Sequence, residues 1–201
     1  MRELVIIAGP YGIGKARLAL KVLGQNVFKG MRIDPQDIYA GLQSHYAIEA
    51  GRPMSNQELK DRTIEKAFSQ PFRMIRKKRD LSVVMTLGQI EDLDLFDAGN
   101  RHDYQISLFY FGTQHWQRCI NSVKNSANHW QKDLSQELLH NNYIRSLAML
   151  PGAIVQSHRG IIFDVNKKGE ARQLLSIENG RVSLIEKALP QWVMDPLQRC
   201  I

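Results

Sequence analysis

The chain opens on the stretch Ile6-Ile7-Ala8-Gly9-Pro10-Tyr11-Gly12-Ile13-Gly14-Lys15-Ala16. An apolar run ends at Gly9 and a helical pattern begins around Gly14, which predicts a strand, a tight turn and a helix. Gly9, Gly14 and Lys15 fit the phosphate-loop spacing G-x-x-x-x-G-K, in which glycines turn backbone N–H groups toward phosphate oxygens. A plain glycine turn with an exposed lysine is the alternative. The three glycines, the lysine and their flanks together favour the phosphate loop.

A helix start would add its positive dipole end to such a loop, and Lys15 would reach the outer phosphates. The sequence therefore predicts ATP or GTP as a ligand, bound by Gly9, Pro10, Tyr11, Gly12, Ile13, Gly14, Lys15, Ala16 and Arg17. One position departs from the motif. The hydroxyl residue that follows the lysine and ligates Mg²⁺ is Ala16, and Arg17 has no hydroxyl either. We expect any Mg²⁺ to be weakly held and assign it no protein ligand.

The composition is that of a globular protein. The chain has 201 residues, 43% of them hydrophobic and 23% charged, which suits one domain. No apolar run reaches the roughly 20 residues that span a bilayer, so we expect no membrane segment. We also expect no signal peptide, because Met1-Arg2-Glu3 leads directly into the first strand. Cys119 and Cys200 lack metal-ligand spacing, which favours a reduced, cytoplasmic protein.

The formal net charge of +7 suits a polyanionic partner, although such an excess also serves solubility. Five basic residues lie in Arg73–Arg79. We interpret them as the C-terminal end of a helix, where cations oppose the negative dipole end. A nucleic-acid patch is the less favoured interpretation, because no aromatic residues interleave with the charges.

Strand and helix patterns alternate along the chain. The sequence predicts an α/β fold with a mostly parallel, five-stranded sheet flanked by helices, as in P-loop NTPases and kinases. Asn179-Gly180 between alternating apolar residues predicts a small C-terminal β-hairpin. We treat residues 1–201 as one domain, with 166–201 as a hairpin-plus-helix extension. Pro71 is expected to kink or interrupt its helix, and a later helical pattern runs to Pro151-Gly152. The expected strands lie at 4–8, 31–33, 81–87, 104–111 and 161–165.

An acidic turn, Asp34-Pro35-Gln36-Asp37, follows the second strand. In open α/β sheets ligands bind outside the carboxyl ends of strands, which would bring this turn beside the phosphate loop. Asp34 also suits a helix N-cap, with Pro35 at the first helical position. Both interpretations can hold together.

With these elements in order, the chain resembles the zeta-toxin-like branch of the phosphate-loop kinases over nearly its full length. Several short matches carry the resemblance, each in its expected place. They are Ala8-Gly9-Pro10-Tyr11-Gly12-Ile13-Gly14-Lys15 for A-G-P-N-G-x-G-K, Ile33–Ile38 for N-x-D-x-I, Val83–Leu87 for F-E-T-T-L, Tyr104–Phe111 for Y-x-V-x-L-x-F, Asn128-His129 for G-G-H, Asn141-Asn142-Tyr143 for R-R-Y, Asp164-Val165-Asn166 for D-N-S, Asn179-Gly180 for N-G, and Leu189-Pro190-Gln191-Trp192 for L-P-x-W.

The resemblance implies transfer of the γ-phosphoryl of a nucleoside triphosphate to a small hydroxyl-bearing substrate, and a possible antitoxin-like protein partner. The family's lysine is Lys15. Its metal-ligating hydroxyl, catalytic carboxylate, strand glutamate and arginine correspond to Ala16, Gln36, Val84 and Asn142.

Asp37, beside Gln36, is therefore the candidate catalytic base together with Lys15. Asp34, Arg118 and Lys124 are candidate substrate-binding residues, and His129 is a further cation near them. Two functions remain: a divergent kinase with weakened or lost catalysis, or an inactive kinase-fold protein that acts as a binding or interaction module.

Overall fold

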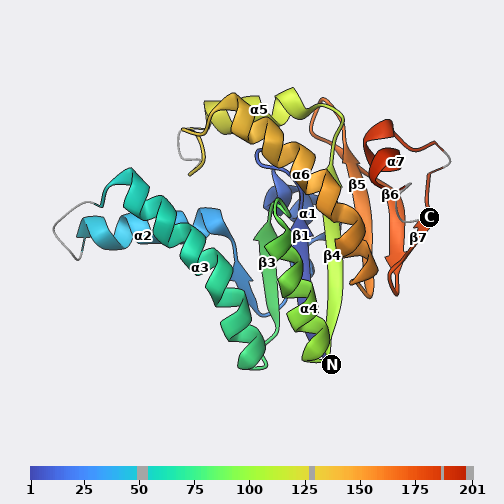
Figure 1. Ribbon diagram of the computed structural model, residues 1–201, viewed down its shortest axis with the longest axis horizontal. Coiled ribbons are helices and arrows are strands. Elements are labelled where there is room, and N and C mark those ends of the chain that lie inside the picture. The colour runs from blue at the N-terminus through green and yellow to red at the C-terminus, as the bar shows by residue number, and fades with distance from the viewer. Residues whose placement is uncertain (49–53, 127–129, 187, 198–201) are drawn as a thin grey trace.

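The computed structural model describes residues 1–48, 54–126, 130–186 and 188–197. In this part of the chain one seven-stranded sheet forms the centre, in the order β2-β3-β1-β4-β5-β6-β7 (Figure 1). The strands are β1 (Arg2–Ala8), β2 (Met31–Ile33), β3 (Leu81–Met85), β4 (Tyr104–Gly112), β5 (Arg159–Val165), β6 (Ala171–Glu178) and β7 (Arg181–Leu184).

The first five strands are parallel, as the sequence predicts. The predicted hairpin is present, but it is not a separate appendage, which corrects the five-strand count. β6 pairs antiparallel with β5 from Arg159↔Glu178 to Val165↔Ala171, and β7 pairs antiparallel with β6. The hairpin thus covers an edge of β5 that would otherwise expose unpaired backbone groups.

Helices cover both faces of the sheet (Figure 1). They are α1 (Lys15–Leu23), α2 (Pro35–Ile48), α3 (Asn56–Arg76), α4 (Asp94–Arg101), α5 (Trp116–Asn125), α6 (Gln136–Val155) and α7 (Gln191–Leu197), with short 3₁₀ helices η1 (Gln25–Val27) and η2 (Ile90–Leu93). Along β1, Leu4, Ile6 and Ala8 pack into one apolar cluster, and Val5 and Ile7 pack into another on the opposite face. Burial on both faces explains why the central strands are continuously apolar.

Local signals set several helix ends. Ser55 and Glu58 form the capping box at the start of α3, where the Ser55 hydroxyl accepts from the Glu58 N–H at 3.2 Å. Neither proline interrupts or ends its helix, since Pro71 lies within α3 and Pro151 within α6. Pro71 is buried, so its packing against the protein outweighs the hydrogen bond that its ring removes. No helix among the described residues is long and apolar enough to cross a membrane.

Candidate nucleotide-binding site

A glycine-rich loop joins β1 to α1. Gly9, Gly12 and Gly14 have φ angles of 143°, 76° and 85°, values that L side chains rarely adopt. Gly14 is the N-cap of α1 and Lys15 is its first residue. The loop therefore presents its backbone at the start of a helix, which is the geometry that binds anions.

Two of the glycines are also required by close backbone approach. A Cβ on Gly9 would lie 2.2 Å from the carbonyl oxygen of Phe111 in β4, and one on Gly12 would lie 2.0 Å from the carbonyl oxygen of Cys119 in α5. Both distances are far shorter than any van der Waals contact. The loop is thus pressed between β4 and α5 in a form that only glycine permits.

Lys15 is half-buried at the head of α1. Its Nζ donates to the Pro10 carbonyl oxygen at 3.2 Å and lies 5.9 Å from the centre of the Tyr11 ring. Burial lowers the pKa of the amine to about 8, and the negative charge of Asp34 partly opposes this shift. An anion bound in the loop would give this ammonium a closer charge partner than Asp34.

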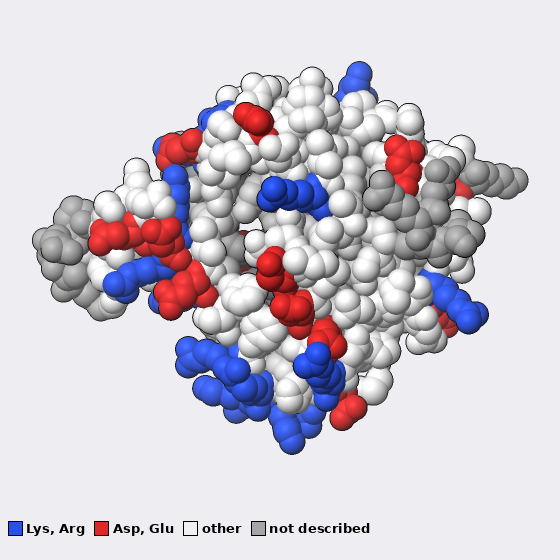
Figure 2. Space-filling model, in the orientation of Figure 1, with Lys and Arg blue, Asp and Glu red and all other residues white. Residues whose placement is uncertain are grey.

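A pocket of about 820 Å³ opens in front of the loop, and Figure 2 shows this face of the molecule hollowed between α3 and α6. The loop contributes Tyr11, Gly12, Gly14, Lys15, Ala16 and Arg17 to its lining. Gly9, Pro10 and Ile13 are buried behind the lining instead. These three residues were predicted to contact phosphate, but their position suits them to shape the loop instead.

The acidic turn lies at the same pocket. Asp34 is buried, and its Oδ1 accepts the Gln36 N–H at 3.0 Å, so it caps α2 as the sequence predicts. Its Oδ2 accepts from Arg32 Nη2 at 2.7 Å. The Asp37 side chain is 61% exposed, and its carboxylate lies 3.4 Å from the same Arg32 nitrogen. Partial burial and the neighbouring Asp34 raise the pKa of Asp37, while Arg32 opposes the shift.

Asn142 ties α6 to the loop. Its Oδ1 accepts the Tyr11 backbone N–H at 3.4 Å, and its Nδ2 packs against Gly88, just after β3. The Tyr11 hydroxyl hydrogen-bonds the side chains of Thr86 and Gln131, and burial raises its pKa. These contacts form a polar wall in which Asn142 stands where the resemblance expects an arginine.

The structure does not bring Arg118 and Lys124 to this pocket. Lys124 Nζ donates to the carbonyl oxygens of Lys132 and Leu134, so it fastens the segment between α5 and α6. Arg118 packs against Gly169 in the turn between β5 and β6, and its Nη1 is buried without a hydrogen-bond partner among the described residues. His129 lies outside the described residues.

Three groups of lining residues were missed by sequence reasoning. An apolar wall on α3 consists of Ile64, Ala67, Phe68, Pro71 and Phe72. Arg145 is exposed on α6, one helical turn after Asn142, with no ion pair within the described part of the chain. Asp92 lies in η2, and its Oδ2 accepts the Gly88 N–H at 2.7 Å. Helical spacing from Asn142 was the one available signal for Arg145.

The residues present do not fit a protein-held Mg²⁺. Ala16 has no side-chain oxygen, and both oxygens of Asp34 already accept hydrogen bonds. Among the described residues no group of three or more His, Cys, Asp or Glu side chains gathers as a metal site. Mg²⁺ would therefore be held by nucleotide phosphates and water, as this ion commonly is.

No family model matches the sequence, and no curated protein matches it. Solved structures do match the fold. The AvrRxo1-ORF1:-ORF2 structure with ATP matches at TM-score 0.64 and 12% identity, covering 99% of this chain and 63% of that chain. The same pair with sulphate ions matches at TM-score 0.60 and 13% identity, covering 93% of this chain and 62% of that chain.

The PezAT toxin–antitoxin system of Streptococcus pneumoniae matches at TM-score 0.53 and 14% identity, covering 99% of this chain and 84% of that chain. This chain thus spans a little under two thirds of the AvrRxo1 chains. At these identities the likeness shows only that this chain shares its fold with the AvrRxo1 and PezAT structures. Function has to be argued from the site.

Proposed function

We propose that this protein binds a purine nucleoside triphosphate through its phosphate loop and that its kinase chemistry is weakened or lost. One observation carries the proposal. Gly9, Gly12 and Gly14 hold positive φ angles in a loop at the start of α1, and Lys15 faces the pocket in front of it. Backbone N–H groups, the helix dipole and the Lys15 ammonium all favour bound phosphates there. Structures of the AvrRxo1 pair with ATP and with sulphate ions, on the same fold, support this ligand class.

Phosphoryl transfer would join an acceptor hydroxyl oxygen to the γ-phosphorus and release the nucleoside diphosphate. Asp37 is the carboxylate placed to take the hydroxyl proton, because it is exposed at the pocket while Asp34 is committed to capping α2. The wall of α3 gives the acceptor side an apolar surface, which suits a small hydroxyl-bearing substrate. Such an enzyme would work in the cytoplasm, where nucleoside triphosphates are supplied.

The groups that stabilise charge on the transferred phosphoryl are depleted. Ala16 and Val84 are apolar, and Asn142 is neutral and bound to the loop. Losing one donor aimed at developing charge typically costs about 2.7–4 kcal/mol, or roughly a hundred- to thousandfold in rate. Several such losses do not simply add, but together they predict poor turnover.

The same observation favours the second candidate function, an inactive kinase-fold protein that acts as an interaction module. The fold is shared with the AvrRxo1-ORF1:-ORF2 pair and with the PezAT toxin–antitoxin system, which supports a protein partner of the antitoxin kind. In that case the nucleotide would order the loop without being consumed.

Titration calorimetry with ATP and GTP, each with and without Mg²⁺, tests nucleotide binding. We expect binding by the wild type and its loss in Lys15→Ala. Lys21→Ala is the matched control, because Lys21 is exposed on the same helix and does not line the pocket. Equal affinity in the wild type and Lys15→Ala would refute the proposed site.

A further inference from the structure

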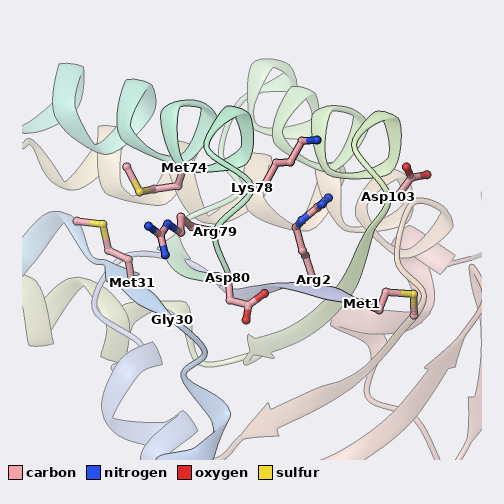
Figure 3. Close-up of a pocket in the computed structure, with 9 residues that line it drawn as sticks. All are labelled: Met1, Arg2, Gly30, Met31, Met74, Lys78, Arg79, Asp80 and Asp103. Atoms are coloured by element: carbon pink, nitrogen blue, oxygen red, sulfur yellow. The ribbon is translucent and has the colours of Figure 1, made fainter.

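A second pocket, of about 960 Å³, lies at the opposite end of the sheet from the phosphate loop (Figure 3). It is built where β1, β2 and β3 begin, beside the end of α3 and the turn between α4 and β4. Its lining consists of Met1, Arg2, Gly30, Met31, Met74, Lys78, Arg79, Asp80 and Asp103. The proposed nucleotide site makes no use of it.

Positive charge gathers at this pocket. We define the basic patch as Arg2, Arg73, Arg76, Lys77, Lys78 and Arg79. Figure 2 shows Lys and Arg side chains collected below the C-terminal end of α3. Within the described residues none of the six forms an ion pair with a carboxylate, and Arg2 donates to the His102 carbonyl oxygen. The helix dipole accounts for cations in the last turn of α3, but not for those beyond it.

Lys78 occupies a position at which glycine would be the more stable residue. The Lys78 N–H donates to the Ile75 carbonyl at 2.9 Å and the Arg79 N–H donates to the Met74 carbonyl at 3.1 Å, which is the Schellman arrangement of a helix end. In this arrangement the first residue after the helix cap has a left-handed backbone conformation. That residue is Lys78, whose φ is 54°. A lysine there is strained where a glycine is not. Its side chain reaches the pocket in return.

We propose that the basic patch and its pocket bind an acidic segment of a partner protein that carries an apolar anchor residue. Glutamates and aspartates of such a segment would pair with the patch. An apolar side chain would enter the part of the pocket lined by Met31 and Met74, because methionine adapts to varied apolar shapes. Backbone N–H groups of the segment would serve Asp103 and the Asp80 oxygen that does not accept the Glu3 N–H.

Nucleic acid fits this pocket less well. Phosphates placed among the cations would also meet Asp80 and Asp103, and among the residues that the structure describes no aromatic side chain lines the pocket to stack with a base. A protein segment carries acceptors, donors and apolar groups together, which matches the mixed lining. The pocket therefore favours an acidic protein over a nucleic acid.

The test uses the full chain and a fluorescein-labelled synthetic peptide in which glutamates flank leucines, titrated by fluorescence anisotropy at roughly physiological ionic strength. We expect Lys78→Gly to weaken binding about fivefold and Lys78→Gly with Arg79→Gln at least tenfold. The melting temperature of Lys78→Gly should stay equal or rise, because glycine relieves the left-handed strain. Met31→Ser, at a residue 41% exposed, should weaken binding about threefold.

Lys168→Gly is the matched control, since it removes the same charge from the exposed turn between β5 and β6. It should leave the peptide affinity unchanged. An equal loss in this control would reduce the effect to net charge and overturn the proposal. The proposal would also be overturned if the peptide did not bind, or if its affinity did not change in Lys78→Gly or in Met31→Ser. It would likewise be overturned if duplex DNA displaced the peptide and bound more tightly than the peptide does. The assay contains no nucleotide, so its outcome is independent of the phosphate-loop proposal.

Discussion

Nucleotide affinity should fall as the pH rises from 7 to 9. Only the protonated Lys15 amine attracts phosphate, and burial lowers its pKa to about 8. About nine tenths of the amine is protonated one unit below that pKa, and about one tenth is protonated one unit above it. If bound phosphate keeps the amine protonated, the association constant falls roughly tenfold across this window, or about 1.4 kcal/mol.

The stability of the free protein should move in the opposite direction. A lysine with a pKa below its unfolded value of about 10.4 binds fewer protons in the folded state. The contribution of Lys15 to stability therefore increases as the pH rises through about 8. A general loss of structure at high pH would lower nucleotide affinity and protein stability together. An affinity that falls while stability rises would therefore indicate Lys15 deprotonation and not unfolding.

Titration calorimetry at pH 7, 8 and 9, at constant ionic strength and without Mg²⁺, measures the affinity. Lys15→Ala should bind weakly and show little dependence on pH in this range. A wild-type affinity that stays constant from pH 7 to 9 would refute the reasoning. So would an equal slope in Lys15→Ala, because another group would then be titrating.

Three further predictions follow from the same loop. Chelating Mg²⁺ should change wild-type nucleotide affinity only a few fold. Ala16→Ser should make the nucleotide affinity depend more strongly on Mg²⁺. If chelation lowered the wild-type affinity by several orders of magnitude, a protein side chain would have to ligate the metal. Gly12→Ala should lower stability by about 2 kcal/mol, or the melting temperature by roughly 4–8 °C, because the added Cβ would lie 2.0 Å from the Cys119 carbonyl oxygen. Labelled ATP should show no transfer to a panel of hydroxyl acceptors above background; robust transfer that disappears in Lys15→Ala would establish a working kinase.

Local signals in the sequence predicted the parts of the fold that neighbouring residues determine. The glycine spacing, the Asp34 cap and the Asn179-Gly180 turn all follow from contacts within a few residues. The pairing of the hairpin with β5 was not predicted, because a turn signal identifies two strands and not the third that they join. Pro71 was misjudged for the same reason, since its burial depends on tertiary packing.

The site residues that lie near the loop in the sequence were predicted. Those that come from distant helices were missed. Lys15 follows the carboxyl end of β1 and Asp37 follows that of β2, at the same edge of the sheet, and both line the pocket. Arg118 and Lys124 were chosen for charge and place in the chain, but the direction of a side chain on α5 depends on how that helix is rotated in the fold. Arg145 faces the pocket from α6 because α6 packs with its Asn142 side toward the loop.

Two of the positions where the resemblance expects polar groups, Ala16 and Val84, pack in the apolar core. Val84 is 4% exposed and belongs to the apolar cluster against which Ala16 packs. Val84→Glu would bury a carboxylate among apolar side chains, which we expect to cost about 3 kcal/mol or more and to lower the melting temperature by roughly 6–12 °C. Val155→Glu, at a residue 64% exposed, is the control and should change stability little.

The pH dependence of Val84→Glu tests the cause. Burial disfavours the charged carboxylate, so its pKa would lie above the unfolded value, and the deficit relative to the wild type should shrink as the pH falls from 8 toward 5. A deficit independent of pH would indicate a steric cause. Adding Ala16→Ser supplies one hydroxyl donor, worth about 1 kcal/mol. The double variant should therefore remain less stable than the wild type, because a polar pair cannot be reinstated in a cluster that packs around two apolar side chains.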